Sequence, residues 1–355
     1  MSGLIDKLLF PLLRVAYTGI YAGGKKANLL TRIYQNRKLI KEERREFETP
    51  NGIPSGAMFE YLQRLERRNA YVYVATALAS INQGALPSCD PNFFRKMHIQ
   101  TDNIATVFMD NKWSVYASVF DLEEIQKKYE PIDGIDYIFP TETLIDFYKR
   151  QIKVEIGKND AFAFLLYAKS SATLAIYQND IFMYSSHIIF DEDVDEEDAG
   201  DQNDMTDFFD ETLSDETIEA NPAEINDVGD DFNSIEDLND FIASDDPASL
   251  DTLSEPSTDD DRAAPPELDL SEDAPRFNIR RDMLLFNFLK NSFNVYYKNE
   301  HFASAFIGSA AIFEGYEGAK SAADFLKKEL CIDAKVYPID ISETVCKMAR
   351  EEAAL

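Results

Sequence analysis

Apolar stretches along the chain predict the same order of elements twice. In the first half, three such stretches separated by short turns predict an antiparallel meander of strands at residues 14–22, 27–34 and 38–47. Apolar residues at helical spacing then predict a helix over residues 58–65, and residues 71–78 predict a fourth strand. The first half is therefore predicted as three strands, a helix and a strand.

The second half repeats this order. A second meander is predicted at residues 161–168, 173–178 and 181–190. Farther along, an apolar helix over residues 283–297 precedes a strand over residues 303–313. A helix, a strand and a helix capped by Ser342 are then predicted at residues 319–326, 335–338 and 342–349.

The repeated order predicts an α/β protein built of two ribonuclease H-like halves, which is the architecture of the actin-like fold. Between the halves, a hairpin at residues 105–120 and a short strand at residues 137–139 are each followed by a helix. The predicted domains are an N-terminal apolar segment (1–13), a first half (14–155) with a small inserted subdomain around 90–150, a second half (156–190 plus 276–355), and an insertion (191–275).

The insertion carries the net charge of −30. Residues 191–275 hold 33 of the 65 acidic residues and one basic residue, Arg262, whereas the rest of the chain has 32 acidic and 34 basic residues. With so few branched apolar residues it cannot offset the entropy of ordering its backbone, so we predict that it is disordered. We hypothesise that two apolar clusters within it bind a partner as amphipathic helices. They contain Phe208, Phe209 and Leu213, and Leu238, Phe241 and Ile242. A solvating spacer that repels anionic lipid is an alternative of equal weight, and nucleic-acid mimicry is a weaker one.

Several runs outside the insertion resemble PilM, the cytosolic actin-like protein of type IV pilus assembly. They are Tyr116–Tyr129, Gly134–Leu144, Phe164–Phe182, Ala305–Gly315 and Ala323–Pro338. The resemblance implies an adaptor that binds the cytoplasmic N-terminal peptide of a single-span, PilN-like inner-membrane protein within a multi-copy ring. Relatives of PilM, PilN and PilO also surround the flagellar motor in some bacteria. The implied machine is therefore a flagellar motor accessory ring or a type IV pilus or secretion system.

The nucleotide motifs of that family are incomplete here. Its second phosphate hairpin carries Asp-x-Gly, whereas the matching positions hold Tyr167 and Lys169. Its first hairpin carries an aspartate, but Val15–Tyr21 contains none, so Mg²⁺ would lack a hard anionic ligand. Its glycine cluster after a strand is reduced to Gly308. We therefore expect no catalytic residue, metal or cofactor, and treat the following as vestigial pocket positions: Thr18, Gly19, Tyr167, Lys169, Ser170, Thr173, Gly308 and Ser309.

The sequence gives only weak signs of a phosphate-binding loop, a histidine site or a cysteine site. The Gly-Gly-Lys-Lys run at residues 23–26 lacks the spacing of a phosphate-binding loop and is typical of a hairpin turn. The three histidines are isolated, and the three cysteines lack C-x-x-C spacing, which indicates reduced thiols in a cytosolic protein and no zinc site.

No apolar run is long enough to predict a membrane span, although residues 8–13 could bind a partner or pack on the core. We hypothesise a non-enzymatic cytoplasmic adaptor, peripheral to the inner membrane through a partner and not binding nucleic acid. The alternatives are an active actin-like ATPase and a regulator acting through the acidic segment.

Overall fold

The computed structural model describes residues 13–152, 160–190, 279–299, 302 and 305–354. These residues all belong to one of the two units into which the chain divides, Met1–Asn221 with Phe277–Leu355. The other unit, Pro222–Arg276, lies outside the described residues, as do the two apolar clusters predicted to bind a partner and the predicted N-terminal apolar segment up to residue 12.

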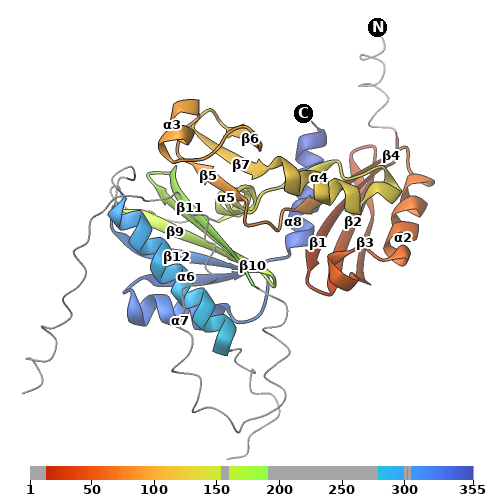
Figure 1. Cartoon of the computed structure of the whole chain (residues 1–355). Helices are drawn as coiled ribbons and strands as arrows, with labels where there is room; N and C mark the ends of the chain where they lie inside the picture. Colours follow the sequence, from red (N-terminus) through yellow and green to blue (C-terminus); the bar gives the residue numbers. More distant parts are fainter. Residues whose placement is uncertain (1–12, 153–159, 191–278, 300–301, 303–304, 355) are drawn as a thin grey trace, which may run out of the picture. The chain divides into compact units, whose positions relative to one another are not determined.

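Two five-stranded sheets with the same topology form the body of this unit (Figure 1). The first has the order β3-β2-β1-β4-β8, in which β1 is antiparallel to β2 and parallel to β4. The second has the order β11-β10-β9-β12-β13, in which β9 is antiparallel to β10 and parallel to β12. Their strands are β1 (Val15–Gly23), β2 (Lys26–Gln35), β3 (Lys38–Glu48), β4 (Tyr71–Ala77) and β8 (Tyr137–Phe139), and β9 (Ala161–Tyr167), β10 (Ser171–Gln178), β11 (Ile181–Ile189), β12 (Ile307–Glu314) and β13 (Asp333–Pro338).

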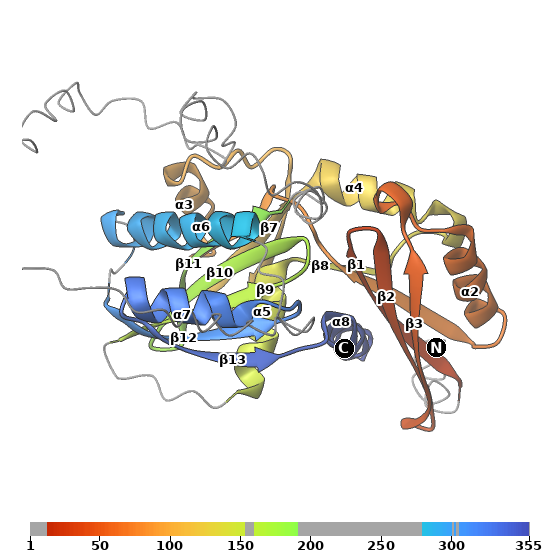
Figure 2. The ribbon, with the colours of Figure 1, turned by 90° about the horizontal axis from the view of Figure 1, so that it is seen from below.

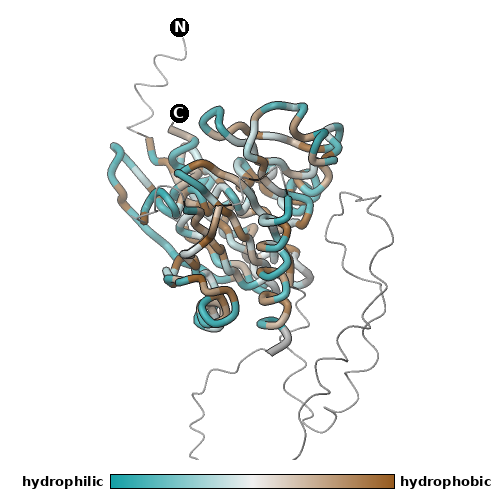
Figure 3. Tube along the Cα trace, turned by 90° about the vertical axis from the view of Figure 1, so that its left-hand side faces the viewer, coloured by the Kyte–Doolittle hydropathy of each residue, from teal (hydrophilic) through white to brown (hydrophobic). Residues whose placement is uncertain are grey.

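Each sheet has a helix-covered outer face. On the first, α2 (Gly56–Glu66) buries Met58, Tyr61, Leu62 and Leu65 against alternate residues of β1 and β2. On the second, α6 (Ile279–Lys298) and α7 (Ala319–Glu329) pack against alternate residues of β9 and β10. Figure 3 shows that hydrophobic positions gather in the interior of the molecule, whereas many outer turns are hydrophilic. The duplicated strand order confirms the predicted α/β actin-like fold of two ribonuclease H-like halves.

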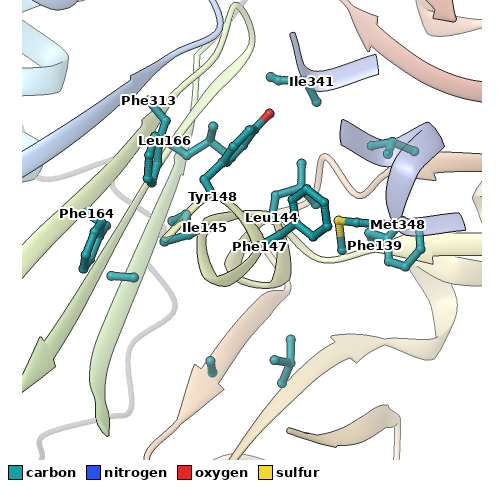
Figure 4. Packing of buried hydrophobic residues seen from close by; sticks show 14 of the residues in the cluster. Phe139, Leu144, Ile145, Phe147, Tyr148, Phe164, Leu166, Phe313, Ile341 and Met348 are labelled. Atoms are coloured by element: carbon teal, nitrogen blue, oxygen red, sulfur yellow. The ribbon is translucent and has the colours of Figure 1, made fainter. Parts of the chain in front are cut away.

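The halves exchange their last helices. Helix α8 (Ile341–Ala353) follows the last strand of the second half but packs on β1, β2 and β4 of the first, and Figure 2 shows it between the two sheets. Helix α5 (Thr141–Gln151) ends the first half but packs on β9 and β10 of the second. Between them lies one shared core, in which Leu144 and Tyr148 meet Phe313 and Met348 (Figure 4). The halves therefore share one core.

The inserted subdomain is smaller than the predicted range of about 90–150. It is the three-stranded sheet β5-β7-β6 with one helix: β5 (Gln83–Leu86), α3 (Pro91–Lys96), β6 (Ile104–Met109) and β7 (Trp113–Ser118). Helix α4 (Val119–Lys128) and α5 flank β8, which pairs with β4 in the first sheet. The short 3₁₀ turns are η2 (Pro50–Gly52) and η3 (Glu130–Ile132). We did not predict β5, because four residues are too few for a clear alternation.

The described residues that flank the acidic segment, Phe190 and Arg281, lie together on the second half. Phe190, which directly follows β11, is buried, and the guanidinium of Arg281 in the first turn of α6 lies 4.5 Å from its ring centroid. The chain thus leaves and re-enters the second half at one place, as an insertion requires. Within the described residues, no helix is both long and apolar enough to cross a membrane.

Candidate functional site

Two β-hairpins, one from each half, lie in direct contact. Tyr21, near the end of β1, accepts a hydrogen bond from the backbone N–H of Lys169 in the β9–β10 turn, 3.0 Å away. Beside it, a Cβ added to Gly23 would lie 3.3 Å from the Cβ of Lys169. Burial raises the pKa of the Tyr21 phenol, so the phenol stays neutral at ordinary pH. A tyrosine therefore occupies the space between the two hairpin turns.

A cleft of about 500 Å³ opens next to this contact. One wall comes from β1, β2 and β3 of the first half, and the other from the segments that follow β12 and β13 in the second. The lining residues used below are Tyr21, Asn28, Arg44, Glu46, Gly315 and Asp340.

Gly315 of the second wall directly follows β12. The N–H of Gly315 donates to the carbonyl of Tyr167 at 2.8 Å, and a Cβ there would lie 2.8 Å from Cδ1 of Ile341, so a side chain would displace the start of α8. Gly318, with φ of +114°, precedes α7 and adopts a conformation that favours glycine. Gly308 and Ser309, which we predicted as pocket positions, lie at the opposite end of β12 from Gly315. Gly315, the cleft glycine directly after β12, was not among our predicted pocket positions.

Two predicted pocket positions on β1 have other contacts. Thr18 faces α2, where its hydroxyl lies 3.0 Å from that of Thr31, which also accepts a hydrogen bond from Tyr61. Gly19 lies under α8: an added Cβ would come within 2.1 Å of the carbonyl oxygen of Ser342. Gly19 therefore allows the close approach of α8 to β1, and neither residue lines the cleft.

Tyr167 also points away from the cleft, into the outer core of the second half. Its hydroxyl accepts a hydrogen bond from Nε of Arg281 at 2.9 Å, and Nη2 of Arg281 donates to the carbonyl of Ala168 at 2.7 Å. Arg281 is buried, with Tyr167, Phe190 and Tyr316 around its guanidinium. Of the predicted pocket positions, Lys169 and Ser170 are those at the hairpin contact.

The acidic groups beside the cleft are held by basic side chains. Asp340 caps α8 by accepting from the N–H of Glu343 at 3.0 Å, so Asp340 rather than Ser342 is the cap. Arg44 of β3 bonds Asp340 and also donates to Glu343 at 2.9 Å. In the first half, Lys26 pairs with Glu46 at 2.6 Å. The ion pairs of Arg44 with Asp340 and Glu343 join the two walls of the cleft.

The negative charge of Glu343 is strongly stabilised by its basic neighbours. Burial alone would raise its pKa, but hydrogen bonds from Lys347, Arg32 and Arg44 lower it to about 2. In the described part of the chain, no group of three or more His, Cys, Asp or Glu side chains is placed to hold a metal ion. Asp340 and Glu343 form ion pairs with Arg32 and Arg44 of the first half and so serve contacts between the halves.

A second buried polar cluster lies where α5 meets β5 and β11. Thr173, another predicted pocket position, is here: its hydroxyl lies 2.7 Å from Nδ1 of His187. Glu142 accepts a hydrogen bond from Ser185 at 3.3 Å, and its second carboxylate oxygen has no hydrogen-bond partner. Burial raises the pKa of Glu142 to about 7 and lowers that of His187 to about 4, so both are largely neutral near pH 6.

The sequence matches two family descriptions. Residues 163–354 match Domain of unknown function (DUF8341), and residues 14–144 match Domain of unknown function (DUF8569). The first match covers more than half of the chain. The chain belongs to the DUF8341 family. The two matched ranges correspond to the two halves of the fold, so this family's domain spans the second half.

Three solved structures are similar to this DUF8341 chain, and one of them is named for an actin-like ATPase fold. A Bacteroides thetaiotaomicron protein with an actin-like ATPase fold and unknown function is 8% identical, with 96% of each chain covered and a TM-score of 0.40. PilM in a PilM–PilN type IV pilus biogenesis complex is 13% identical, with 93% of this chain and 89% of that chain covered and a TM-score of 0.48. The ethanolamine utilization protein EutJ from Carboxydothermus hydrogenoformans is 8% identical, with 94% of this chain and 89% of that chain covered and a TM-score of 0.35. No curated protein matches the sequence. The fold assignment rests on the strand order of the two sheets.

Proposed function

We propose that this chain is a non-enzymatic scaffold of the actin-like fold. It would bind the cytoplasmic tail of a PilN-like inner-membrane protein, in a flagellar motor accessory ring or a type IV pilus or secretion system. It would thus be cytoplasmic and peripheral to the membrane. The observation that carries the proposal is the hydrogen bond between Tyr21 and the backbone N–H of Lys169.

This bond bears on nucleotide binding because phosphate groups in such clefts are held by backbone N–H groups of the hairpin turns. Here the amide of Lys169 already has a partner, and the ring of Tyr21 stands where the two turns face each other. The carboxylates of Asp340 and Glu46 are paired with Arg44 and Lys26. Binding Mg-ATP would require breaking these contacts.

Titration calorimetry with Mg-ATP and the full-length chain tests this part of the proposal. We expect no heat of binding up to millimolar nucleotide. Micromolar affinity that is lost in Gly315→Ala, with Gly56→Ala as the control away from the cleft, would overturn it. The rival function, an active ATPase, is favoured by the volume of the cleft and by Gly315 in its lining. The same measurement separates the two.

The scaffold also needs a surface for its partner. Apolar side chains gather where the inserted subdomain joins the first half: Ile81 (47% exposed), Val119 and Phe120 (70% exposed). They are neighbours because the N–H of Ser118 donates to the carbonyl of Asn82 at 2.9 Å. Exposed aromatic and branched residues of this kind are typical anchors for an apolar peptide segment.

Binding of the partner's cytoplasmic N-terminal peptide, measured by fluorescence anisotropy, tests this surface. We expect Phe120→Ser to weaken binding by at least tenfold. Phe306, which is 65% exposed at the start of β12, provides the matched control, and Phe306→Ser should bind like wild type. Equal affinity of the two variants would place the partner elsewhere on the chain.

A further inference from the structure

Exposed apolar side chains gather at one end of the first sheet. The register of the strands brings together the start of β1, the turn between β2 and β3, and the start of β4. Val15 of β1 pairs with Tyr34 of β2 and with Tyr71 of β4, and the N–H of Ala70 donates to the carbonyl of Arg14 at 2.9 Å. The exposed apolar residues at this end are Leu13 (37%), Leu39 (48%), Ile40 (47%) and Tyr71 (44%).

Five basic side chains belong to the same end. Arg37 lies in the β2–β3 turn, Lys38 begins β3, and Arg67 and Arg68 follow α2 shortly before β4 begins. Together with Arg14, all of them are exposed, and none forms an ion pair with another described residue. The strand-end surface is defined as Leu13, Arg14, Arg37, Lys38, Leu39, Ile40, Arg67, Arg68 and Tyr71.

Basic residues farther along β2 and β3 are neutralised by carboxylates. Their ion pairs are Lys26–Glu46, Arg32–Glu42, Lys41–Glu43 and Arg44–Asp340. At the strand-end surface the positive charges have no such partners among the described residues, so they remain available to an anionic ligand.

Acidic groups near this end, such as Glu66 and Glu352, lie toward β8. Burial and then the charges of Asp133 and Asp136 raise the pKa of Glu66, which places these carboxylates together beside η3. Glu352 of α8 lies near Tyr137 of β8, whose pKa is raised by burial and by neighbouring charges. Strand β8 is the edge of the sheet opposite β3, so these carboxylates and the β2–β3 turn lie toward opposite edges.

The chain that precedes Leu13 is apolar. Residues 4–12 include Leu4, Ile5, Leu8, Leu9, Phe10 and Leu12. These residues lie outside the described part of the chain, but Leu13 attaches them directly to the strand-end surface. Apolar side chains beside a basic cluster are the combination that attaches a protein to an anionic bilayer: the apolar groups enter the headgroup boundary, and lysine and arginine attract the headgroups.

We propose that the strand-end surface binds directly to a bilayer that contains anionic lipids. The exposed arginines and Lys38 contact the lipid phosphates, and Leu39, Ile40 and Tyr71 enter the boundary layer, where aromatic rings are favoured. The acidic segment joins the second half at Phe190 and Arg281, and anionic headgroups repel it. This contact needs no partner protein, so it goes beyond the proposed function and does not depend on it.

Vesicle sedimentation with the purified full-length chain, without any partner, tests the proposal. We expect vesicles of equal parts phosphatidylglycerol and phosphatidylcholine to bind at least about tenfold more tightly than vesicles of phosphatidylcholine alone, because each lysine or arginine near an anionic surface contributes about fivefold. Equal binding to both kinds of vesicle, or no binding to the anionic ones, would overturn it. The second result would indicate that an acidic peptide, such as the chain's own acidic segment, occupies this surface.

A double charge reversal locates the contact. Lys38→Glu with Arg68→Glu should weaken binding to the anionic vesicles by at least about tenfold. Lys320→Glu with Lys328→Glu is the matched control, because both lysines are exposed on α7 of the second half and the net charge changes equally. Equal losses in the two variants would show that net charge and not the strand-end surface governs binding.

A second pair of variants tests the apolar contact. Leu39→Gln with Ile40→Gln should weaken binding to the anionic vesicles by at least about fivefold, because two apolar side chains no longer leave water. Val107→Gln with Phe108→Gln is the control, since these neighbours are 62% and 52% exposed on another edge strand, β6. A Leu39/Ile40 variant that binds like this control would contradict the proposal. Peptide binding at Phe120 should be unchanged in all of these variants, which separates failure here from failure of the proposed function.

Discussion

The hydroxyl of Tyr21 accepts a hydrogen bond from the backbone N–H of Lys169, 3.0 Å away, and so joins the first strand of one half to the first turn of the other. The two residues are 148 positions apart. Their contact fills the space between two hairpins that would otherwise be lined by backbone amides. The cleft beside it is further held together by the ion pairs of Arg44.

Tyr21→Phe keeps the ring and removes the acceptor. The amide of Lys169 then lies buried without its partner, so we expect the free energy of unfolding in urea to fall by about 1–2 kcal/mol. Tyr337→Phe is the control, since it removes a hydroxyl near the second half's last strand and preserves the ring contact with Phe313. A variant as stable as wild type would show that the hairpins do not depend on this bond.

Gly19→Ala should strongly destabilise the protein, although it adds only one methyl group. The added methyl would meet the backbone of α8 at Ser342 and Cys346, 2.1 and 2.5 Å away, and a helix backbone cannot move without disturbing the shared core. We expect a loss of about 3 kcal/mol or more in stability, measured by thermal unfolding. Gly56→Ala at the start of α2 has nothing within 4 Å and should be neutral or stabilising.

The buried cluster at α5 predicts opposite pH dependences for two variants. The folded-state pKa of Glu142 is raised from 4.5 to about 7. The contribution of Glu142 to the free energy of unfolding is therefore complete below pH 4.5 and is lost as pH rises to 7. The folded-state pKa of His187 is lowered from 6.5 to about 4, so its contribution is complete above pH 6.5 and is lost as pH falls to 4. In wild type these two trends partly cancel between pH 4.5 and 6.5.

Replacing one of the two residues should therefore leave only the pH dependence of stability that the other residue contributes. Relative to wild type, Glu142→Gln should become more stable as pH rises from 4.5 to 7, by on the order of 3 kcal/mol. His187→Gln should become more stable, relative to wild type, as pH falls from 6.5 to 4. Urea unfolding across this range measures both differences, and slopes of the same sign would contradict the burial of one of the two groups.

Replacing residues 191–275 with a short Gly/Ser linker should leave the fold intact. Arg281 lies 4.5 Å from the ring of Phe190, so the ends to be joined are already close together. We expect a melting temperature within about 3 °C of wild type, since both sheets and their covering helices are built from other residues. Partner binding should persist in a scaffold, whereas its loss in a folded variant would favour a regulator acting through the acidic segment.

The local sequence pattern was sufficient to predict most helices and strands, but it was not sufficient to predict the candidate site. The three-strand meanders and the helix containing Met58 and Leu62 follow from alternation and helical spacing. Gly308 and Gly315 lie at opposite ends of β12, and only the direction of that strand in the folded protein shows which of them reaches the cleft. Thr18 and Tyr167 were misplaced for a related reason: the face on which a strand residue lies depends on what packs there.

The sequence by itself determined the duplicated order of elements and the confinement of the negative charge to one segment, because both are properties of residues close together along the chain. It also showed that the first strand lacks an acidic residue. Only the tertiary structure decided that Tyr21 meets Lys169, that α8 presses on Gly19, and that β6 is an open edge. The α8 contact arises because the second half gives its last helix to the first. All three features depend on how segments far apart in the chain are placed, and such long-range packing leaves no local pattern in the sequence.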